Sequence, residues 1–320
     1  MTRSPAVLTA ILLTERSVPS DAPPLSASEF WAVVRTFDLV QVAEQGLPNP
    51  VEVTRSRTVD QRRVGSLLAR STSVAFELDR LHQSGVTVLS ALDDAYPRHL
   101  RQRLGDSAPP LLYVAGDTSL FTKESLAIVG SRGVSAMGAD VARHAARHAV
   151  AEGLAVVSGG ARGVDQLAMA AAWEEGGVVV AVLSEGLDRP LRSRENRAAV
   201  LEGRALLCSP YKPAAGFSAG NAMARNKIVY AQSSLALVVA SDEGSGGTWA
   251  GAVEALSKRL APVAVWTGGG AGPGNVALVE RGAEPVDDLV QLLAIRDAPV
   301  HVGPPGRAAS STQLGLDLPL

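Results

Sequence analysis

The sequence predicts an α/β fold in which a doubly wound, mostly parallel sheet follows an N-terminal helical module. After Leu126, short β-branched runs alternate with alanine-rich amphipathic stretches, as a parallel sheet covered by helices requires. Before residue 120, apolar residues recur mostly at helical spacings among charged ones. Parallel strands need crossovers of about a dozen residues, and the alanine-rich stretches supply them.

Each expected strand is a short apolar run. The strands are Leu126–Val129, Leu154–Ser158, Val178–Leu183, Ala205–Ser209, Leu235–Ala240 and Pro262–Trp266. The expected helices span residues 136–152, 164–175, 195–202, 221–232, 247–259 and 274–281. Strands and helices that alternate in this way make a doubly wound domain.

The first part of the chain has its own helix signals. Ser26-Ala27-Ser28-Glu29 is a typical helix start, and Gly85 is placed to end a helical stretch that reaches His82. The stretch after Asp297 is rich in Pro, Gly and Ser and has no period. We therefore expect an N-terminal helical module at 1–82, the α/β domain at 83–296 and a disordered tail at 297–320.

The composition excludes several classes of protein. A chain of 320 residues forms two domains at most, at about 150 residues per domain. The hydrophobic fraction of 46% excludes a disordered chain. Thirty Lys and Arg against 32 Asp and Glu give a net charge of −2, so a nucleic-acid site must be a local concentration of cations.

Cysteine, histidine and hydropathy indicate the compartment. The single cysteine, Cys208, cannot form an intramolecular disulfide, and the five His show no metal-ligand spacing. The apolar stretch Ala6–Leu13 is short and has no cleavage pattern after it, so we interpret it as a buried helix. We expect a cytoplasmic protein without a membrane span, metal or cofactor.

Three loops of small residues follow expected strands at the edge where an open parallel sheet binds ligands. Glycines let the main chain approach a phosphate, and N–H groups of the next helical turn point toward it. The expected phosphate-loop residues are Gly130, Ser131, Ser158, Gly159, Gly160, Gly163, Gly246, Gly247 and Thr248. The alternative is that each glycine only makes a tight turn.

Positive charge gathers beside these loops. Arg132 and Arg162 stand within two of them, and guanidinium groups suit phosphate oxygens. Arg225-Asn226-Lys227 precedes the fifth strand, although such a cluster is often only a solvated face. Phe217, between Gly216 and Ser218, would stack on a base or plug the layer between helix and sheet.

Common enzyme motifs do not occur. The sequence contains neither G-x-x-x-x-G-K-[ST] nor a G-x-G-x-x-G directly after a strand. Ser184-Glu185-Gly186 is not a nucleophile elbow. One carboxylate candidate, Glu254, follows the Gly246-Gly247-Thr248 loop, and its simpler interpretation is an exposed helix acid.

Six motifs occur in order between Gly85 and Ala283. They are Asp93-Asp94-Ala95-Tyr96-Pro97-Arg98-His99-Leu100, Pro109-Pro110-Leu111-Leu112-Tyr113-Val114-Ala115-Gly116, Ile128-Val129-Gly130-Ser131-Arg132, Ser158-Gly159-Gly160-Ala161-Arg162-Gly163-Val164-Asp165, Val182-Leu183-Ser184-Glu185-Gly186-Leu187-Asp188, and Phe217 to Lys227. Together they resemble the DNA-processing family DprA, also called Smf, which is related to the LOG superfamily.

The resemblance implies an extended Rossmann-like domain. It implies a homodimer that binds single-stranded DNA and hands it to the recombinase RecA during uptake and recombination of incoming DNA, as a loader and not as an enzyme. The residues that match positions of the DNA pocket are Arg132, Arg162, Phe217, Arg225, Asn226 and Lys227. Affinity should then fall with salt, and sequence preference should be slight.

Two departures from the family pattern leave alternatives open. Gln166-Leu167-Ala168-Met169 replaces a segment in which the family usually has a His. The stretch from Gly246 to Ala252 is closer to the loop of LOG-type nucleotide-cleaving proteins, so one alternative is a nucleotide-binding or nucleotide-hydrolysing protein that uses Gly246-Gly247-Thr248 and Glu254. The other is an interaction scaffold that binds no DNA.

Overall fold

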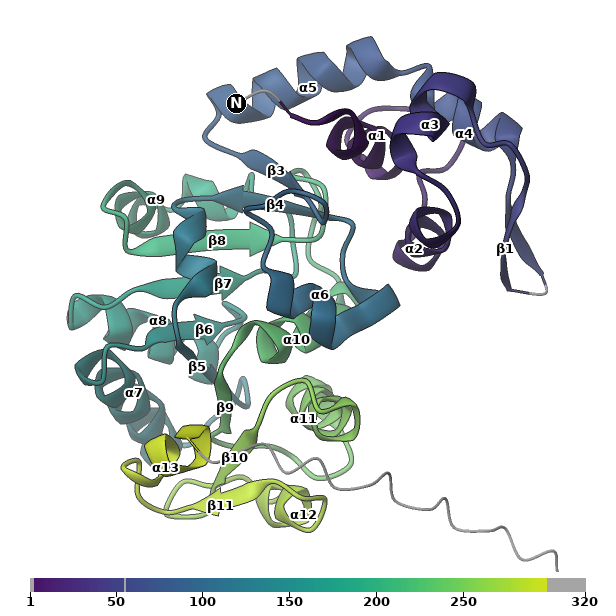
Figure 1. The fold of residues 1–320 in the computed structure, drawn as a ribbon. Coiled ribbons are helices and arrows are strands. Elements are labelled where there is room, and N and C mark those ends of the chain that lie inside the picture. The colour runs from purple at the N-terminus through teal and green to yellow at the C-terminus, as the bar shows by residue number, and fades with distance from the viewer. Residues whose placement is uncertain (1–2, 55, 298–320) are drawn as a thin grey trace, which may run out of the picture.

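The core of the molecule is one twisted sheet whose strands are mostly parallel (Figure 1). A computed structural model describes residues 3–54 and 56–297. In this part of the chain the sheet has nine strands, in the order β11 (Glu284–Val286), β10 (Val263–Trp266), β9 (Leu235–Val238), β5 (Ser125–Val129), β6 (Ala155–Ser158), β7 (Val179–Val182), β8 (Ala205–Ser209), β4 (Leu111–Ala115) and β3 (Thr87–Ser90). The predicted α/β, doubly wound, Rossmann-like fold is confirmed.

The strand order reverses between β5 and β9. From β5 the chain adds β6, β7 and β8 in turn on one side, and then returns to place β9 on the other side of β5. β5 pairs in parallel with both β6 and β9. All five residues of β5 are buried, because helices cover both faces of the sheet. A reversal of this kind opens a crevice at the carboxyl ends of the two strands.

Helices form a layer on each face (Figure 1). On one face, α7 (Ala136–Ala151) and α8 (Val164–Glu174) pack their alanine-rich sides on the sheet. On the other face, α10 (Ala219–Gln232) and α11 (Gly246–Lys258) share a core with Ala127 and Val238. The remaining helices of the domain are α6 (Arg98–Leu104), α9 (Arg194–Leu201), α12 (Asn275–Val279) and α13 (Gln291–Asp297), with single 3-10 turns at Gly105–Ser107, Thr118–Thr122 and Pro190–Arg192.

The six strands and six helices expected after residue 120 are all present, with ends shifted by a few residues at most. Three strands at the margins of the sheet were not expected. β4 pairs antiparallel with β8, and β3 pairs antiparallel with β4. β11 adds a short parallel strand next to β10. The sheet is therefore larger at both edges than the alternating pattern predicts.

The N-terminal module contains five helices within the described residues: α1 (Pro5–Thr14), α2 (Ala27–Thr36), α3 (Leu39–Gln45), α4 (Gln61–Leu68) and α5 (Ser71–Gln83). The start signal is confirmed, because Ser26 and Glu29 form a reciprocal capping box at α2. A small hairpin of β1 (Val51–Thr54) and β2 (Arg57–Val59), which helical spacing did not predict, joins α3 to α4.

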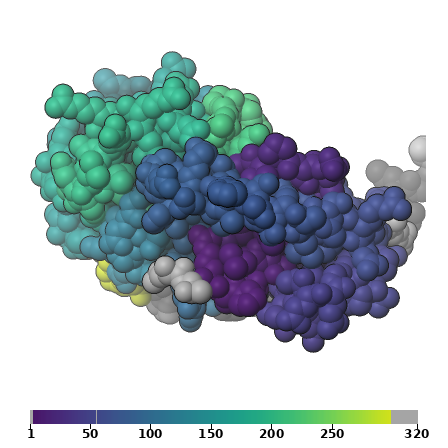
Figure 2. All heavy atoms as spheres, turned by 90° about the horizontal axis from the view of Figure 1, so that it is seen from above, coloured from purple at the N-terminus to yellow at the C-terminus, as the bar shows by residue number. Residues whose placement is uncertain are grey.

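The module is packed on the β3 edge of the sheet, and Figure 2 shows it from that side. The Tyr113 hydroxyl of β4 donates a hydrogen bond of 2.8 Å to the buried Glu15 carboxylate. Arg70, 8% exposed, donates to the carbonyl oxygens of Leu12, Glu15 and Val18. The boundary at residue 82 stays a prediction, and 298–320, almost all of the predicted tail, lie outside the described residues.

The length and polarity of the helices decide whether any of them could span a membrane. Within 3–54 and 56–297, every helix is too short or too polar to cross a bilayer. The stretch Ala6–Leu13, expected to be a buried helix, lies within α1, and Val7, Ala10, Ile11 and Leu13 are among its buried residues.

Candidate functional site

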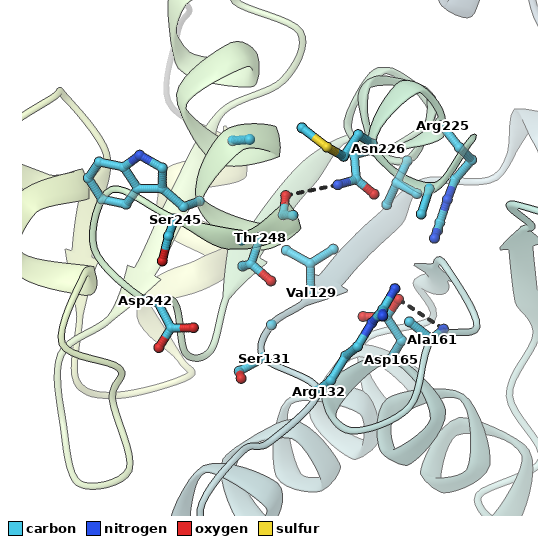
Figure 3. A pocket seen from close by; sticks show the side chains of 18 of the residues that line it. Val129, Ser131, Arg132, Ala161, Asp165, Arg225, Asn226, Asp242, Ser245 and Thr248 are labelled. Atoms are coloured by element: carbon cyan, nitrogen blue, oxygen red, sulfur yellow. Dashed lines mark hydrogen bonds between the residues drawn. The ribbon is translucent and has the colours of Figure 1, made fainter. Parts of the chain in front are cut away.

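A pocket of about 560 Å³ opens at the carboxyl ends of β5 and β9, where the strand order reverses (Figure 3). Its walls are the loop after β5, part of the loop after β6, the loop after β9 and one side of α10. This is the edge at which a doubly wound sheet binds its ligands. The three glycine loops therefore converge as the sequence predicts.

Glycine is required where the first two loops touch. Gly163 has a φ of +81°, a conformation that side chains with a Cβ rarely adopt. A Cβ at this position would also overlap with the backbone of Ser131 and Arg132. The loop after β6 can thus lie against the loop after β5 only because residue 163 has no side chain.

A buried carboxylate organises the loop after β6. Oδ2 of Asp165 accepts hydrogen bonds from the backbone N–H groups of Gly159 (3.1 Å) and Ala161 (3.3 Å). Burial raises the pKa of Asp165, and the nearby Arg225 together with these two N–H groups acts against that rise. Asp165 therefore orders the loop and places a partly compensated acid at the pocket wall.

Arg225 is a buried cation that faces the pocket from α10 (Figure 3). Only 3% of the residue is exposed, and burial lowers the pKa of its guanidinium, while Asp165 acts to raise it. Its Nε atom is buried without a hydrogen-bond partner among the described residues, and no ion pair within 4 Å is formed there either. A buried cation with unused donors is stabilised when an anion enters beside it.

Arg132 is the second cation of the pocket and is exposed. Its guanidinium lies over the ring of Phe217, 5.4 Å from the centroid. Phe217 itself is 51% exposed, so the ring does not plug the layer between helix and sheet. The pair forms a rim on which a flat, anionic ligand can stack and pair its charge.

Asn226 ties α10 to the third loop. Its side-chain Nδ2 donates a hydrogen bond of 2.9 Å to the carbonyl oxygen of Gly247 (Figure 3). Gly251 of α11 packs closely on the same side chain. The amide therefore fixes the distance between the two helices that flank the pocket.

The structure separates the predicted site residues into groups. Those that line the pocket are Arg132, Arg225, Asn226, Gly130, Ser131, Gly246, Gly247 and Thr248. Those that support it from behind are Ser158, Gly159, Gly160 and Gly163. Arg162 is exposed and, like Phe217, is outside the lining. Lys227 lines a different groove, on the other side of α10.

Several residues at the pocket were not singled out in the sequence. Asp165 and Asp242 supply carboxylates, and Met223 and Tyr230 supply apolar and aromatic surface. The available signal for Asp165 was its place directly after a glycine loop, which is where a carboxylate can accept two loop N–H groups. Met223 and Tyr230 have no such signal, because they lie on a long helix whose orientation is set by the fold.

Glu254 is not at the pocket. It lies six residues after Thr248 on α11, about 9 Å along the helix axis at 1.5 Å per residue. Its carboxylate pairs instead with Lys258, at 2.6 Å. Glu254 therefore gives the nucleotide-hydrolysing alternative no carboxylate at the pocket. Among the described residues, no three His, Cys, Asp or Glu side chains gather as metal ligands would.

Fold and pocket together define a class: a doubly wound α/β protein with a pocket at its topological switch point, lined by glycine loops and two arginines. The family model for DNA recombination-mediator protein A matches residues 87–295. The chain belongs to this family, which is the DprA/Smf family that the sequence motifs resemble.

Individual relatives agree with this assignment. A protein of Mycobacterium tuberculosis that carries the DprA name is 30% identical over 282 residues, which cover 79% of this chain and 69% of the relative. The crystal structure of DNA processing protein A from Streptococcus pneumoniae is 25% identical, with a TM-score of 0.60 over 84% of this chain and 86% of that one. DNA processing protein A from Helicobacter pylori, a structure described for its single-stranded DNA binding mode, shares the fold at 24% identity, with a TM-score of 0.54 over 65% of this chain and 94% of that one.

Proposed function

We propose that this protein binds single-stranded DNA in the pocket between β5, β9 and α10. The observation that carries the proposal is Arg225, a buried guanidinium that faces the pocket and whose Nε has no protein partner among the described residues. A backbone phosphate would supply the missing anion, and Arg132 on the rim would pair with a second one. The single-stranded DNA binding mode described for the Helicobacter pylori relative supports this choice of ligand.

The geometry also fits a strand without sequence preference. The pocket is lined by the glycine loops after β5 and β9 and by two guanidiniums, which recognise phosphates rather than bases, together with the carboxylates of Asp165 and Asp242. Phe217 is the exposed aromatic ring beside them, and every base can stack on such a ring. The protein is therefore proposed as a DNA-binding protein and not as an enzyme.

The wider role follows from the family. We infer that the bound strand is passed to the recombinase RecA during recombination of incoming DNA, that the protein acts in the cytoplasm and that it works as a homodimer. The DNA-processing names of its relatives support the first step of this inference. Coprecipitation with RecA in the presence of a single strand, and the mass of the protein in solution, test the two partner assignments.

The test of DNA binding is fluorescence anisotropy with a labelled oligonucleotide over a range of salt. Arg132→Ala and Arg225→Met each remove a proposed phosphate contact, and methionine keeps most of the buried volume. Each should weaken binding about fivefold at 0.1 M salt, because one contact contributes a slope of about 0.7 to log K against log salt. Arg80→Ala, an exposed arginine on α5, is the matched control. Absence of binding by the parent, or parent-like affinity in both variants, would refute the proposal.

A further inference from the structure

A second groove, of about 700 Å³, lies between the N-terminal module and the α/β domain. Residues 14–27 of the module form one wall. The opposite wall consists of the loop after β8, which includes Tyr211 and Lys212, and of one side of α10. Five prolines line it, and their fixed φ angles keep the walls stiff: Pro19, Pro24, Pro109, Pro110 and Pro210.

Helix α10 separates this groove from the DNA pocket. Ala222, Met223 and Asn226 face the pocket, whereas Ala224 and Lys227 face the groove. Arg225 and Lys227 are about 200° apart around the helix and leave it on opposite sides, whereas Met223 and Lys227, four residues apart, are neighbours where the two sites meet. Between them, the outer surface of α10 carries small or apolar exposed residues, and its sequence from 219 to 232 contains no Asp or Glu. Nothing on this helix would repel a polyanion that crosses it.

The groove concentrates positive charge. Arg16, Lys212 and Lys227 are among the described residues that line it, and no Asp or Glu is. Within the described chain, neither lysine side chain forms an ion pair or a hydrogen bond, while the Arg16 side chain donates only to the carbonyl oxygen of Leu25.

Three carboxylates behind and beside the groove are already engaged, whereas Asp21, next to the lining residue Ser20, is exposed to solvent. Glu15 accepts from the Tyr113 hydroxyl, Asp106 pairs with Arg35, and Glu254 pairs with Lys258. In a chain of net charge −2, three cations in a groove free of acids are a local exception.

An aromatic ring completes the groove. Tyr211 is half-buried, and its hydroxyl donates a hydrogen bond of 2.8 Å to the carbonyl oxygen of Asn221 on α10. The bond holds the ring in one orientation at the groove wall. Cations that track a backbone, together with a fixed ring for a base, are the two parts of a sequence-independent site for a single strand.

We propose that a bound single strand continues from the pocket across the exposed side of α10 into this groove, where Lys212, Lys227 and Arg16 contact its phosphates. This inference rests on the proposed function. It assigns a binding role to the N-terminal module, and it explains why Lys227, two residues from Arg225, lies away from the pocket.

The first test uses oligonucleotide length. A strand of about 4 nucleotides is short enough to occupy one site, and one of about 16 nucleotides is long enough to reach both. The double variant Lys212→Ala/Lys227→Ala should bind the short strand as the parent does and the long strand about 25-fold more weakly at 0.1 M salt, with a salt slope smaller by about 1.4. The matched control is Lys123→Ala. Lys123 is exposed and lies just before β5, at the amino ends of the parallel strands, so this variant should bind both oligonucleotides as the parent does.

The outcomes separate this inference from the proposed function. Binding of both lengths by the double variant as by the parent, or equal weakening of both, would overturn the extension into the groove while the pocket proposal stands. Binding of neither length by the parent would remove both. In the second test, a 5-iodouracil at one end of the long strand should cross-link to Tyr211 on irradiation. The label is placed at each end of the long strand in turn. If neither label cross-links to the peptides of residues 14–27 or 210–215, the strand does not enter the groove.

Discussion

The guanidinium of Arg225 lies directly over the backbone of Gly159. A Cβ at residue 159 would overlap with Nη1, the nearest atom of Arg225, with Cζ and Nη2 close behind. Arg225 comes from α10 and Gly159 from the end of β6, so the two are distant in the chain. Because Gly159 has no side chain, the guanidinium of Arg225 can occupy this position at the pocket wall.

Gly159→Ala should therefore displace Arg225 and damage both folding and binding. Arg225 is 3% exposed, so overpacking around its side chain should cost about 1–3 kcal/mol of unfolding free energy. Affinity for single-stranded DNA should fall at the same time. Denaturant unfolding and anisotropy measure the two effects.

Gly133→Ala is the matched control for this substitution. Gly133 lies in the neighbouring loop, its φ is not positive, and a Cβ there would meet no atom within 4 Å. This variant should behave as the parent does in both measurements. If Gly159→Ala also did so, Arg225 would not be held in the position that the structure gives it.

The alternating strands and helices, and the convergence of three glycine loops, were predictable because each rests on a local pattern and on the common direction of parallel strands. The separation of Arg225 from Lys227 was not. Arg225 and Lys227 form one cluster in the sequence. Residues two apart in a helix are separated by roughly 200° around its axis, so the two side chains point to different sides. Which side faces the pocket depends on how α10 packs on the sheet, and no local signal gives that.

The margins of the sheet show the same limit. The apolar run Leu111–Ala115 forms the fully buried strand β4. Its sequence does not predict that it pairs with β8 or that the pairing is antiparallel. The alternating pattern identifies parallel units, because their crossovers are helices. The antiparallel strands β3 and β4 need no helical crossover, so the alternating pattern does not identify them.

Asn226 should act on DNA binding through the loop that it holds. Asn226→Ala removes the hydrogen bond to Gly247 and should cost about 1 kcal/mol of unfolding free energy, with a moderate loss of affinity. Asn226→Asp also loses the donor and places a negative charge at the pocket, so it should bind DNA more weakly than Asn226→Ala. Anisotropy at two salt concentrations checks this, and the charge effect should shrink at the higher one. Equal affinities in the two variants would place Asn226 away from the strand.

Glu29 should make the stability of the N-terminal module depend on pH. Burial acts to raise the pKa of Glu29, but hydrogen bonds from Arg63 and Ser26 outweigh it and lower the pKa from its ordinary 4.5 to about 2. Because the pKa is depressed in the folded state, the stabilisation is complete above about pH 4.5 and is lost as the pH falls toward 2. Glu29→Gln keeps the helix cap and removes the charge next to Arg63.

At pH 7, Glu29→Gln should therefore cost about 1.5–3 kcal/mol of unfolding free energy, the usual contribution of a hydrogen bond to a charged group. The difference from the parent should narrow between pH 4.5 and 2. Denaturant unfolding at several pH values measures it, and Glu44→Gln, at an exposed position on α3, is the control. A difference that stays constant down to pH 2 would show that Glu29 does not act through its charge.

Cys208 should report the opening of the sheet. Burial raises the pKa of its thiol to about 12, and 1% of the residue is exposed, so the folded protein presents almost no thiolate at pH 8. A disulfide reagent should then react only through molecules in which β8 has opened. The Gly159→Ala variant should react faster, by about tenfold for each 1.4 kcal/mol that it loses, if opening requires global unfolding. Cys208→Ala gives the background, and rapid reaction of the folded parent would mean that β8 opens locally, without the rest of the sheet.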